Sequence, residues 1–182
     1  MANKVKYGLS KVYYAVWTES TDTYATPVAM PGAVSLSIDQ EGETNKFRAD
    51  NVDYYVTVSN NGYSGTLELA LIPDSFLTDV LGEGTDNTSG LQYELANVQP
   101  NPFALLFQFE GDVSATRHVL YNCKATRPSI AGATTEASIE PQTETLNIVA
   151  SPRAVDYVVK AKCDDDATAY STFYTAVQKP TI

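Results

Sequence analysis

The sequence contains little of the residue types on which most enzyme chemistry depends. Its 182 residues include two cysteines and one histidine. Ser-His-Asp, Cys-His and histidine-metal sites all need a histidine, so the single His118 removes most of them, and it is expected to be an ordinary, partly exposed side chain. Cys123 and Cys163 lie in separate strand-like segments without CxxC spacing. They therefore predict small buried residues instead of a zinc or redox site.

Positive charge is also scarce. The chain has 12 basic and 22 acidic residues, which gives a formal net charge of -10 and a pI near 4.4. Binding to nucleic acid depends on Lys and Arg side chains that release counterions from phosphates, so a nucleic-acid binder is disfavoured. Solubility explains the charge most simply, and a surface that lets nucleic acid pass without sticking is the alternative.

Long apolar runs are absent from the sequence. No run approaches the roughly 18 apolar residues of a membrane span, and the N-terminal MANKVKYGLSK lacks the apolar core of a signal peptide. We therefore expect a protein that stays in a cytoplasm and has no membrane partner. The length favours one domain over residues 1–182. The polar ends, about 1–10 and 178–182, are expected to be mobile arms that neighbouring subunits order.

What the sequence does contain is the apolar-polar alternation of β-strands. Residues 54–69 read YYVTVSNNGYSGTLEL, which predicts a β-hairpin turning at Asn-Asn-Gly, with Leu67, Leu69 and Leu71 facing the core. Its other face is polar and offers no nucleophile, base and metal-ligand set, which is typical of a surface. Further strands are predicted at 11–18, 33–39, 103–110, 115–126, 144–150 and 154–163.

Helical patterns are few and short. Phe76 and Val80 stand at i,i+4 in a predicted helix over residues 73–82, and Asp166 is a candidate N-cap for a second one over 167–177. Long polar connections are expected at 40–51 and 83–90. The predicted fold is mainly β, an antiparallel β-sandwich or barrel with one or two flanking short α-helices.

The remaining polar clusters predict no catalytic, cofactor or metal site. Asp164, Asp165 and Asp166 lack the ligand spacing of an EF-hand loop and are expected to form a solvated turn. Gly82 and Gly84 follow a predicted helix, whereas a phosphate-binding glycine loop leads from a strand into a helix. An enzyme is therefore the least favoured class.

Four segments in order along the chain read NNGYSGTLELALIPDSF, NPFALLFQFEGD, TRHVLYNCKATRPS and SIEPQTETLNI. Together they resemble the major tail proteins of long, non-contractile-tailed bacteriophages, over nearly the whole chain. The resemblance implies a tail-tube domain, without the C-terminal immunoglobulin-like domain of some relatives, that forms stacked hexameric rings. It also implies a virion location after assembly in the host bacterial cytoplasm.

The same resemblance implies partners and a lumen, while the length and charge of the 40–51 connection predict contact residues. The partners are further copies of the chain, a tape measure protein, a tail terminator and distal tail proteins, while double-stranded DNA passes through without specific binding. The 40–51 connection is expected to contact neighbouring subunits, with Phe47 as apolar anchor and Arg48 pairing an acid. Further contact candidates are Glu41, Glu43 and Asp50. Candidates for facing the lumen are Thr66, Glu68 and Glu144.

Two alternatives stay open. A ligand-binding β-sandwich, such as a carbohydrate-binding module, would use exposed tyrosines and Trp17 to stack on sugar rings. A secretion-system tube protein would share the ring architecture of the phage protein. Particle size separates the first from the tube proteins, because a binding module stays monomeric whereas a tube subunit forms rings.

Overall fold

The structure is a computed structural model that describes residues 3–134 and 141–181. The strands of its large sheet are β1 (Lys6–Thr18), β2 (Thr23–Tyr24), β3 (Val28–Ala29), β4 (Ala33–Glu41), β7 (Gly62–Leu69), β10 (Phe103–Gly111), β11 (Thr116–Ala125), β12 (Glu144–Ser151) and β13 (Lys160–Cys163). Smaller sheets pair β5 (Thr44–Ala49) with β6 (Val52–Val58), and β8 (Gly84–Thr85) with β9 (Gln92–Tyr93). The helices are α1 (Asp74–Asp79) and the 3-10 helix η1 (Glu19–Thr21).

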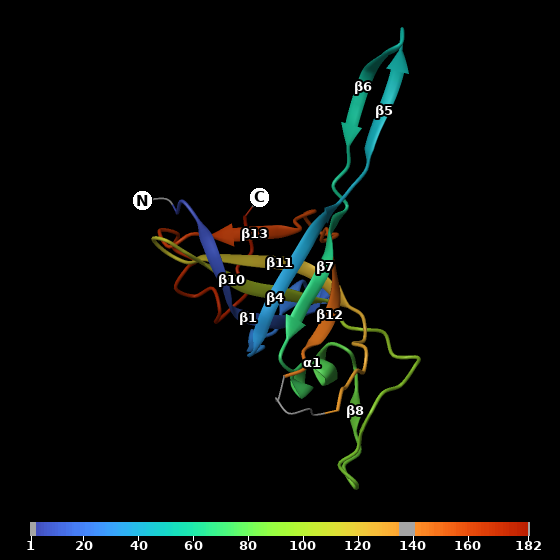
Figure 1. Cartoon of the computed structure of the whole chain (residues 1–182), viewed down its shortest axis with the longest axis vertical. Coiled ribbons are helices and arrows are strands. Elements are labelled where there is room, and N and C mark those ends of the chain that lie inside the picture. The colour runs from blue at the N-terminus through green and yellow to red at the C-terminus, as the bar shows by residue number, and fades with distance from the viewer. Residues whose placement is uncertain (1–2, 135–140, 182) are drawn as a thin grey trace.

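The large sheet is antiparallel and has nine strands. Its order is β2-β1-β10-β11-β12-β7-β4, with β13 also paired to β11 and β3 to β1. Figure 1 shows that this sheet forms the body of the molecule, with α1 at one end of it. The prediction of a mainly β fold with an antiparallel sheet and few short helices is confirmed. None of the helices in the described part of the chain has the length and apolar character to cross a membrane.

The sheet divides at β11. The first half of this strand, residues 117–120, pairs with β13, and the second half, residues 122–125, pairs with β12. The strands β12, β7 and β4 therefore continue the sheet from one half of β11 only. This division gives the sheet two layers with apolar side chains between them.

A β-bulge lies at the same place on β11. Phe103 of β10 is opposite Cys123, whereas Leu105 is opposite Leu120, so β11 has one extra residue between these pairs. An extra residue moves the following side chains to the other face of the sheet. In the strand predicted at 115–126, regular alternation would place Val119, Tyr121, Cys123 and Ala125 on one face, but the first two and the last two lie in different apolar clusters.

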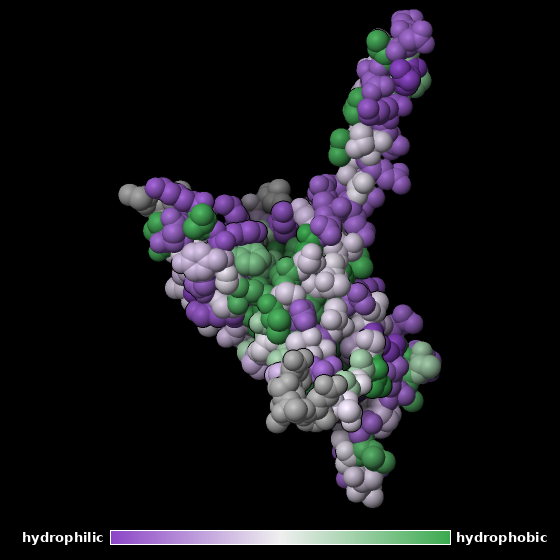
Figure 2. Space-filling view, in the orientation of Figure 1, coloured by the Kyte–Doolittle hydropathy of each residue, from purple (hydrophilic) through white to green (hydrophobic). Residues whose placement is uncertain are grey.

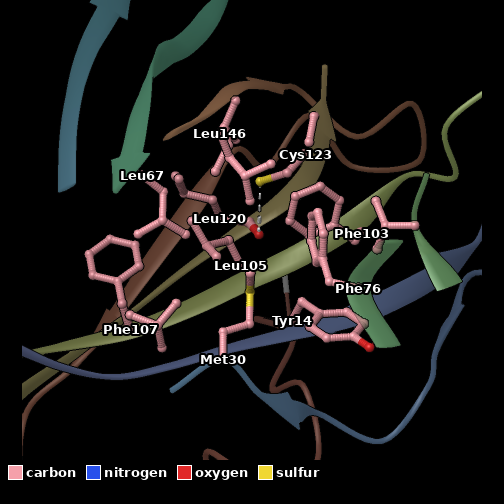
Figure 3. Packing of buried hydrophobic residues seen from close by; sticks show 14 of the residues in the cluster. Tyr14, Met30, Leu67, Phe76, Phe103, Leu105, Phe107, Leu120, Cys123 and Leu146 are labelled. Atoms are coloured by element: carbon pink, nitrogen blue, oxygen red, sulfur yellow. Dashed lines mark hydrogen bonds between the residues drawn. The ribbon is translucent and has the colours of Figure 1, made fainter. Parts of the chain in front are cut away.

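The larger apolar cluster lies between the two layers and under α1. Phe76 of α1 is fully buried and packs edge-on against Tyr14 and Phe103, with ring centroids 5.1 and 5.4 Å apart (Figure 3). The smaller cluster covers the opposite face of β1, β10 and β11, where Phe173 is 2% exposed. Cys123 belongs to the larger cluster and Cys163 to the smaller one, so the prediction of two small buried residues is confirmed.

The helix predicted at 73–82 is present over Asp74–Asp79, and both Phe76 and Val80 are buried as expected. Leu71, in contrast, is 67% exposed. The prediction that it faces the core was wrong because β7 ends at Leu69, and the alternation of a strand no longer applies beyond that point.

The second predicted helix, over residues 167–177, is not formed. This segment is a series of turns, in which the Tyr170 N–H donates to the Ala167 carbonyl and the Thr175 N–H to the Thr172 carbonyl. The hydroxyls of Thr172 and Thr175 also donate to carbonyls three residues earlier. Threonine side chains compete in this way with helical backbone bonds, and β-branched and aromatic residues have low helix propensity.

Two other predicted boundaries were wrong. β1 begins at Lys6 and pairs there with Gly111, so half of the expected N-terminal arm is strand; the ordering of the arms by neighbours stays a prediction. The strand predicted at 154–163 is reduced to β13, because Arg153 and Asp156 form an ion pair of 2.5 Å and Tyr157 has a φ of 58°. The polar connection predicted at 83–90 is mostly loop, as expected, and only Gly84 and Thr85 form a strand, β8, which pairs with β9.

We predict that Phe76→Ala lowers the free energy of unfolding by about 3–5 kcal/mol, because it leaves a cavity between two aromatic rings. Leu71→Ala, at an exposed position, should change it by less than about 0.5 kcal/mol. Urea unfolding of both variants measures the two values. Equal stability of the two variants would contradict the placement of α1 in the core.

Candidate functional site: a polar sheet face and a projecting ribbon

The two strands of the hairpin predicted at 54–69 do not pair with each other in the structure. β6 pairs with β5, and β7 pairs with β4 and β12. The turn lies at Asp50 and Asn51, whose φ angles of 52° and 63° fit a two-residue type I′ turn. The connection expected at 40–51 is therefore mostly strand. The turn expected at 60–62 is where the chain returns into the large sheet.

Gly62, the last residue of the predicted turn, lies at a close approach of β12. A Cβ atom there would come within 2.0 Å of the Ala150 carbonyl oxygen, and the φ of Gly62 is 117°. The backbone pairing continues past this point, since the Asn61 N–H donates to the Glu41 carbonyl and the Ser59 N–H to the Glu43 carbonyl. β4 with β5, and β6 with β7, are thus the two arms of one long, interrupted hairpin.

The outer part of this long hairpin, residues 44–58, is called the ribbon here. It projects from the body as the upper end of the molecule in Figure 1. Its large apolar side chains are exposed: Phe47, Val52, Tyr54, Tyr55, Val56 and Val58. A two-stranded ribbon without a core is marginally stable by itself, and gathered exposed apolar residues mark interaction surfaces. The ribbon therefore has the character of a binding element.

The structure places the predicted contact residues along this ribbon and its root. Glu41 ends β4 and Glu43 follows it, both exposed. Phe47 is 63% exposed and lies opposite Tyr55. Asp50 is at the turn.

Arg48 already has partners within the chain. Its Nε lies 3.3 Å from an Asp53 carboxylate oxygen, and its guanidinium donates to the Asn51 carbonyl. Lys46 pairs with the same carboxylate at 2.8 Å. All three side chains are substantially exposed, so these pairs contribute little to stability and leave the cations accessible.

A polar face covers β4, β7 and β12 on the side away from the core. Register brings the side chains into three rows: Ser35, Glu68 and Thr145; Ser37, Thr66 and Asn147; Asp39, Ser64 and Val149. We call this set the polar face. Its nine residues include two carboxylates and no cation, and Lys124 of β11 borders the set beside Val149. The alternate residues Leu36, Leu67 and Leu146 point into the core.

The sequence-predicted lumen candidates are only partly brought together. Thr66 and Glu68 lie in the polar face, in the central strand β7. Glu144 pairs with Leu69 on the opposite side of the sheet, where its carboxylate accepts a hydrogen bond from the Ile72 N–H. Sequence reasoning missed the members from β4 and β12, because strand pairing across distant segments cannot be read from alternation alone.

Glu68 is held in place by its neighbours in the sheet. Its carboxylate accepts hydrogen bonds of 2.6 Å from the Thr143 hydroxyl and 2.8 Å from the Ser35 hydroxyl. These bonds lower the pKa of Glu68, Thr143 more than Ser35, because they stabilise the ionised form. The polar face thus keeps a negative charge at neutral pH in the middle of the three strands.

Other side chains considered in the sequence lie elsewhere. His118 stacks on Phe107 with ring centroids 5.3 Å apart. Trp17, a candidate for sugar stacking, is 3% exposed and its indole N–H donates to Asp22, so that part of the carbohydrate-binding alternative was wrong. Within the described residues, no group of three His, Cys, Asp or Glu side chains is arranged to hold a metal ion.

Comparison with known proteins identifies the fold. Searches with models of protein families and among curated proteins found no match. Among solved structures, a chain of the PVC sheath-tube complex, an extracellular contractile injection system in its extended state, matches with a TM-score of 0.51 and 12% identity over 85% of this chain and 88% of that chain. A chain of the 6-fold symmetrised baseplate of the anti-feeding prophage (AFP) matches with a TM-score of 0.50 and 12% identity over 92% and 99%.

These similarities show a tail-tube-like fold, shared with components of contractile injection systems. At this level of identity, the likeness concerns the fold alone.

We predict that amide hydrogens in β5 and β6 exchange at least about tenfold faster in the monomer than those in β4 and β7, since the ribbon has no core beneath it. Asn51→Val should accelerate exchange in the ribbon further, because a β-branched residue disfavours positive φ. Asn51→Gly is the matched control and should not accelerate exchange in the ribbon, because glycine adopts positive φ without strain. Equal protection in all four strands would show that the ribbon is stable alone.

Proposed function

We propose that the chain is a structural subunit that assembles into hexameric rings, stacked into the tube of a tail-like injection assembly. The observation that carries this proposal is the polar face, a three-strand surface with Asp39 and Glu68 and no cation. Such a surface suits a conduit through which a charged or hydrated cargo moves without binding. Neither a nucleophile nor a base is required, because the function lies in geometry and charge.

The comparisons favour one kind of tube. The solved structures with this fold come from a contractile injection system in the extended state and from a 6-fold symmetrised baseplate, which supports the six-membered ring and the stacked arrangement. The tube of a contractile injection assembly is therefore our first candidate. The tail tube of a long, non-contractile-tailed phage is the second, supported by the four sequence segments described above.

Ring formation would use the free edge of the sheet. β4 is a nine-residue strand at the edge of the sheet order; it has no lysine or proline, and its two charged residues, Asp39 and Glu41, lie near one end. Long edge strands with few charges and no proline tend to pair with other chains. The edge strand β13, in contrast, has four residues, of which Lys160 and Lys162 are two. The open edge at β4 is thus the better place for a neighbouring subunit.

A lumen lined by the polar face would bind nucleic acid only weakly. Phosphates bind where Lys and Arg displace their counterions, and a surface with carboxylates and hydroxyls offers no such exchange. Repulsion from the carboxylates is screened beyond roughly 8 Å in physiological salt, so the DNA or other acidic cargo would stay solvated and mobile. We retain Thr66 and Glu68 as lumen candidates, and we no longer favour Glu144, whose carboxylate is used by the backbone of Ile72.

The ribbon would supply the contacts between stacked rings. Its exposed aromatic residues and its two cations differ from the acidic body of the chain, and it reaches well beyond that body in Figure 1. Contact residues at its root and tip are Glu41, Glu43, Phe47, Arg48 and Asp50. Large aromatic residues and arginine are enriched among residues that dominate binding energy.

We predict that Phe47→Ala gives a folded monomer that assembles poorly, with a loss of about 2 kcal/mol or more in contact energy per subunit. The thermal stability of the monomer should be unchanged, since the side chain is 63% exposed. Electron microscopy and sedimentation measure tube yield. Thr57→Ala, on the same ribbon, is the matched control. A normal tube yield from Phe47→Ala would rule out this residue as the anchor.

We also predict that Glu68→Lys produces tubes that retain DNA. The substitution changes the subunit charge by two units and, in a hexamer, repeats the new cation six times in each ring. Co-sedimentation of DNA should be negligible for the natural tubes and strong for the variant, and it should fall steeply with added salt.

The matched control for this experiment is Glu19→Lys, an equal charge change in η1, outside the polar face. DNA retention by Glu68→Lys alone supports the lumen placement. Equal retention by both variants, or negligible retention by both at low salt, would contradict it. Subunits that remain monomeric at all concentrations would contradict the tube itself and favour a binding module.

A further inference from the structure

An apolar hollow opens on the surface between the two layers of the sheet. It has a volume of about 240 Å³ and is lined by Lys6, Leu36, Ile38, Tyr63, Phe107, Phe109, His118, Leu120 and Lys160. Phe107 and Leu120 are buried at its floor, and the other apolar members are partly exposed. Figure 2 shows apolar surface gathered in the notch between the ribbon and the opposite upper corner of the molecule.

The rim of this hollow is positively charged. Lys6 Nζ lies 4.6 Å from the ring centroid of Phe109, and Lys160 Nζ lies 4.5 Å from that of Tyr63. His118 is neutral at pH 7, because burial and the nearby Lys6 lower its pKa from 6.5. In a chain of net charge -10, a hollow edged by two lysines is complementary to an apolar segment that carries a carboxylate.

The size of the hollow argues for a side chain as its occupant. Small-molecule sites usually occupy about 300–1,000 Å³ and contain several converging polar groups. This hollow is smaller, and its lining has no polar side chain apart from the tyrosine, the histidine and the two lysines of the rim. It resembles instead the pockets at protein interfaces that receive one or two apolar anchors.

A segment with the complementary character lies at the other end of the molecule. Around β9, Leu91, Tyr93 and Leu95 are 67%, 47% and 49% exposed, and Glu94 between them is also exposed. We call residues 91–95 the lower segment. It belongs to the β8–β9 hairpin, which projects at the end opposite the ribbon in Figure 1.

We infer that the hollow receives the lower segment of a second copy of the chain, with its apolar side chains in the hollow and Glu94 facing the lysines of the rim. This inference rests on the proposed stacking of identical subunits. When copies stack in the same orientation, the two ends of the subunit meet, so they must be complementary. The ribbon cannot be the occupant in such a stack, because it extends from the β4–β7 side of the hollow and points away from it in every copy.

The first test uses Leu91, which is more exposed than the other two apolar residues of the lower segment, Tyr93 and Leu95. Leu91→Asp would bring a charge into the apolar hollow and should raise the concentration needed for assembly about tenfold or more. Val155→Asp, at a 62% exposed position outside both surfaces, is the matched control and should have no effect. Sedimentation velocity over a concentration series measures both, and circular dichroism confirms that each variant is folded.

The second test exchanges the charges. Lys160→Glu and Glu94→Lys should each weaken assembly, and the double variant should restore it, because only the double variant places opposite charges together again. Glu94 also pairs with Arg127 at 2.5 Å, so the folded state of its variant is checked by thermal unfolding. Restoration by the double variant supports the contact.

The outcomes separate this contact from the proposed function. If the natural chain forms rings or tubes while Leu91→Asp and the charge variants do so equally well, the hollow contact is overturned and the tube stands. If the natural chain forms no assembly at any concentration, the tube and the contact are both overturned. Single charge variants that assemble poorly without restoration in the double variant would also overturn the pairing of Glu94 with Lys160.

Discussion

The burial of β10 on both faces is the constraint on which the rest of the structure depends. Residues Phe103 to Phe107 and Gln108 are buried without interruption, so this strand has no side that can face water. One side is covered because the sheet divides at β11 and folds β12, β7 and β4 over it, together with α1. The other side is covered by the C-terminal turns through Phe173 and Tyr174.

This arrangement decides which surface is left polar. The strands that cover β10 present Leu36, Leu67 and Leu146 to it, so their alternate residues must point outward. Those outward residues form the polar face, whose hydroxyls and carboxylates are properly solvated or bonded to each other. A candidate conduit surface is therefore a direct consequence of covering a doubly buried strand with amphipathic ones.

Several elements could be predicted from the sequence because their signals are local. The apolar run of β10, the i,i+4 pair in α1 and the burial of both cysteines all follow from the residues within one segment. The polar nature of Thr66 and Glu68 could be read in the same way. Their partners in β4 and β12 could not, because they are set by pairing between residues that are far apart in the chain.

The errors have equally specific causes. Asn-Asn-Gly at 60–62 is a stronger turn signal than Asp50-Asn51, yet the positive φ angles of Asp50 and Asn51 close the ribbon, and Gly62 serves a close approach to β12. The bulge in β11 places Cys123 and Ala125 on the opposite face of the sheet from the one that alternation predicts. No residue type in that strand predicts the bulge. In the last turns, threonine hydroxyls replace the helical bonds expected after the candidate N-cap Asp166.

The ribbon is present at one end of the subunit only, and this asymmetry has a consequence for any polymer of the chain. A filament of such subunits has a direction, with free ribbons displayed at one terminus and unfilled receiving surfaces at the other. The two termini of such a filament would differ in chemistry and would grow at different rates. A contact that repeats identically from one subunit to the next does not limit the number of subunits in the filament. Filament length must then be set by something other than the subunit itself.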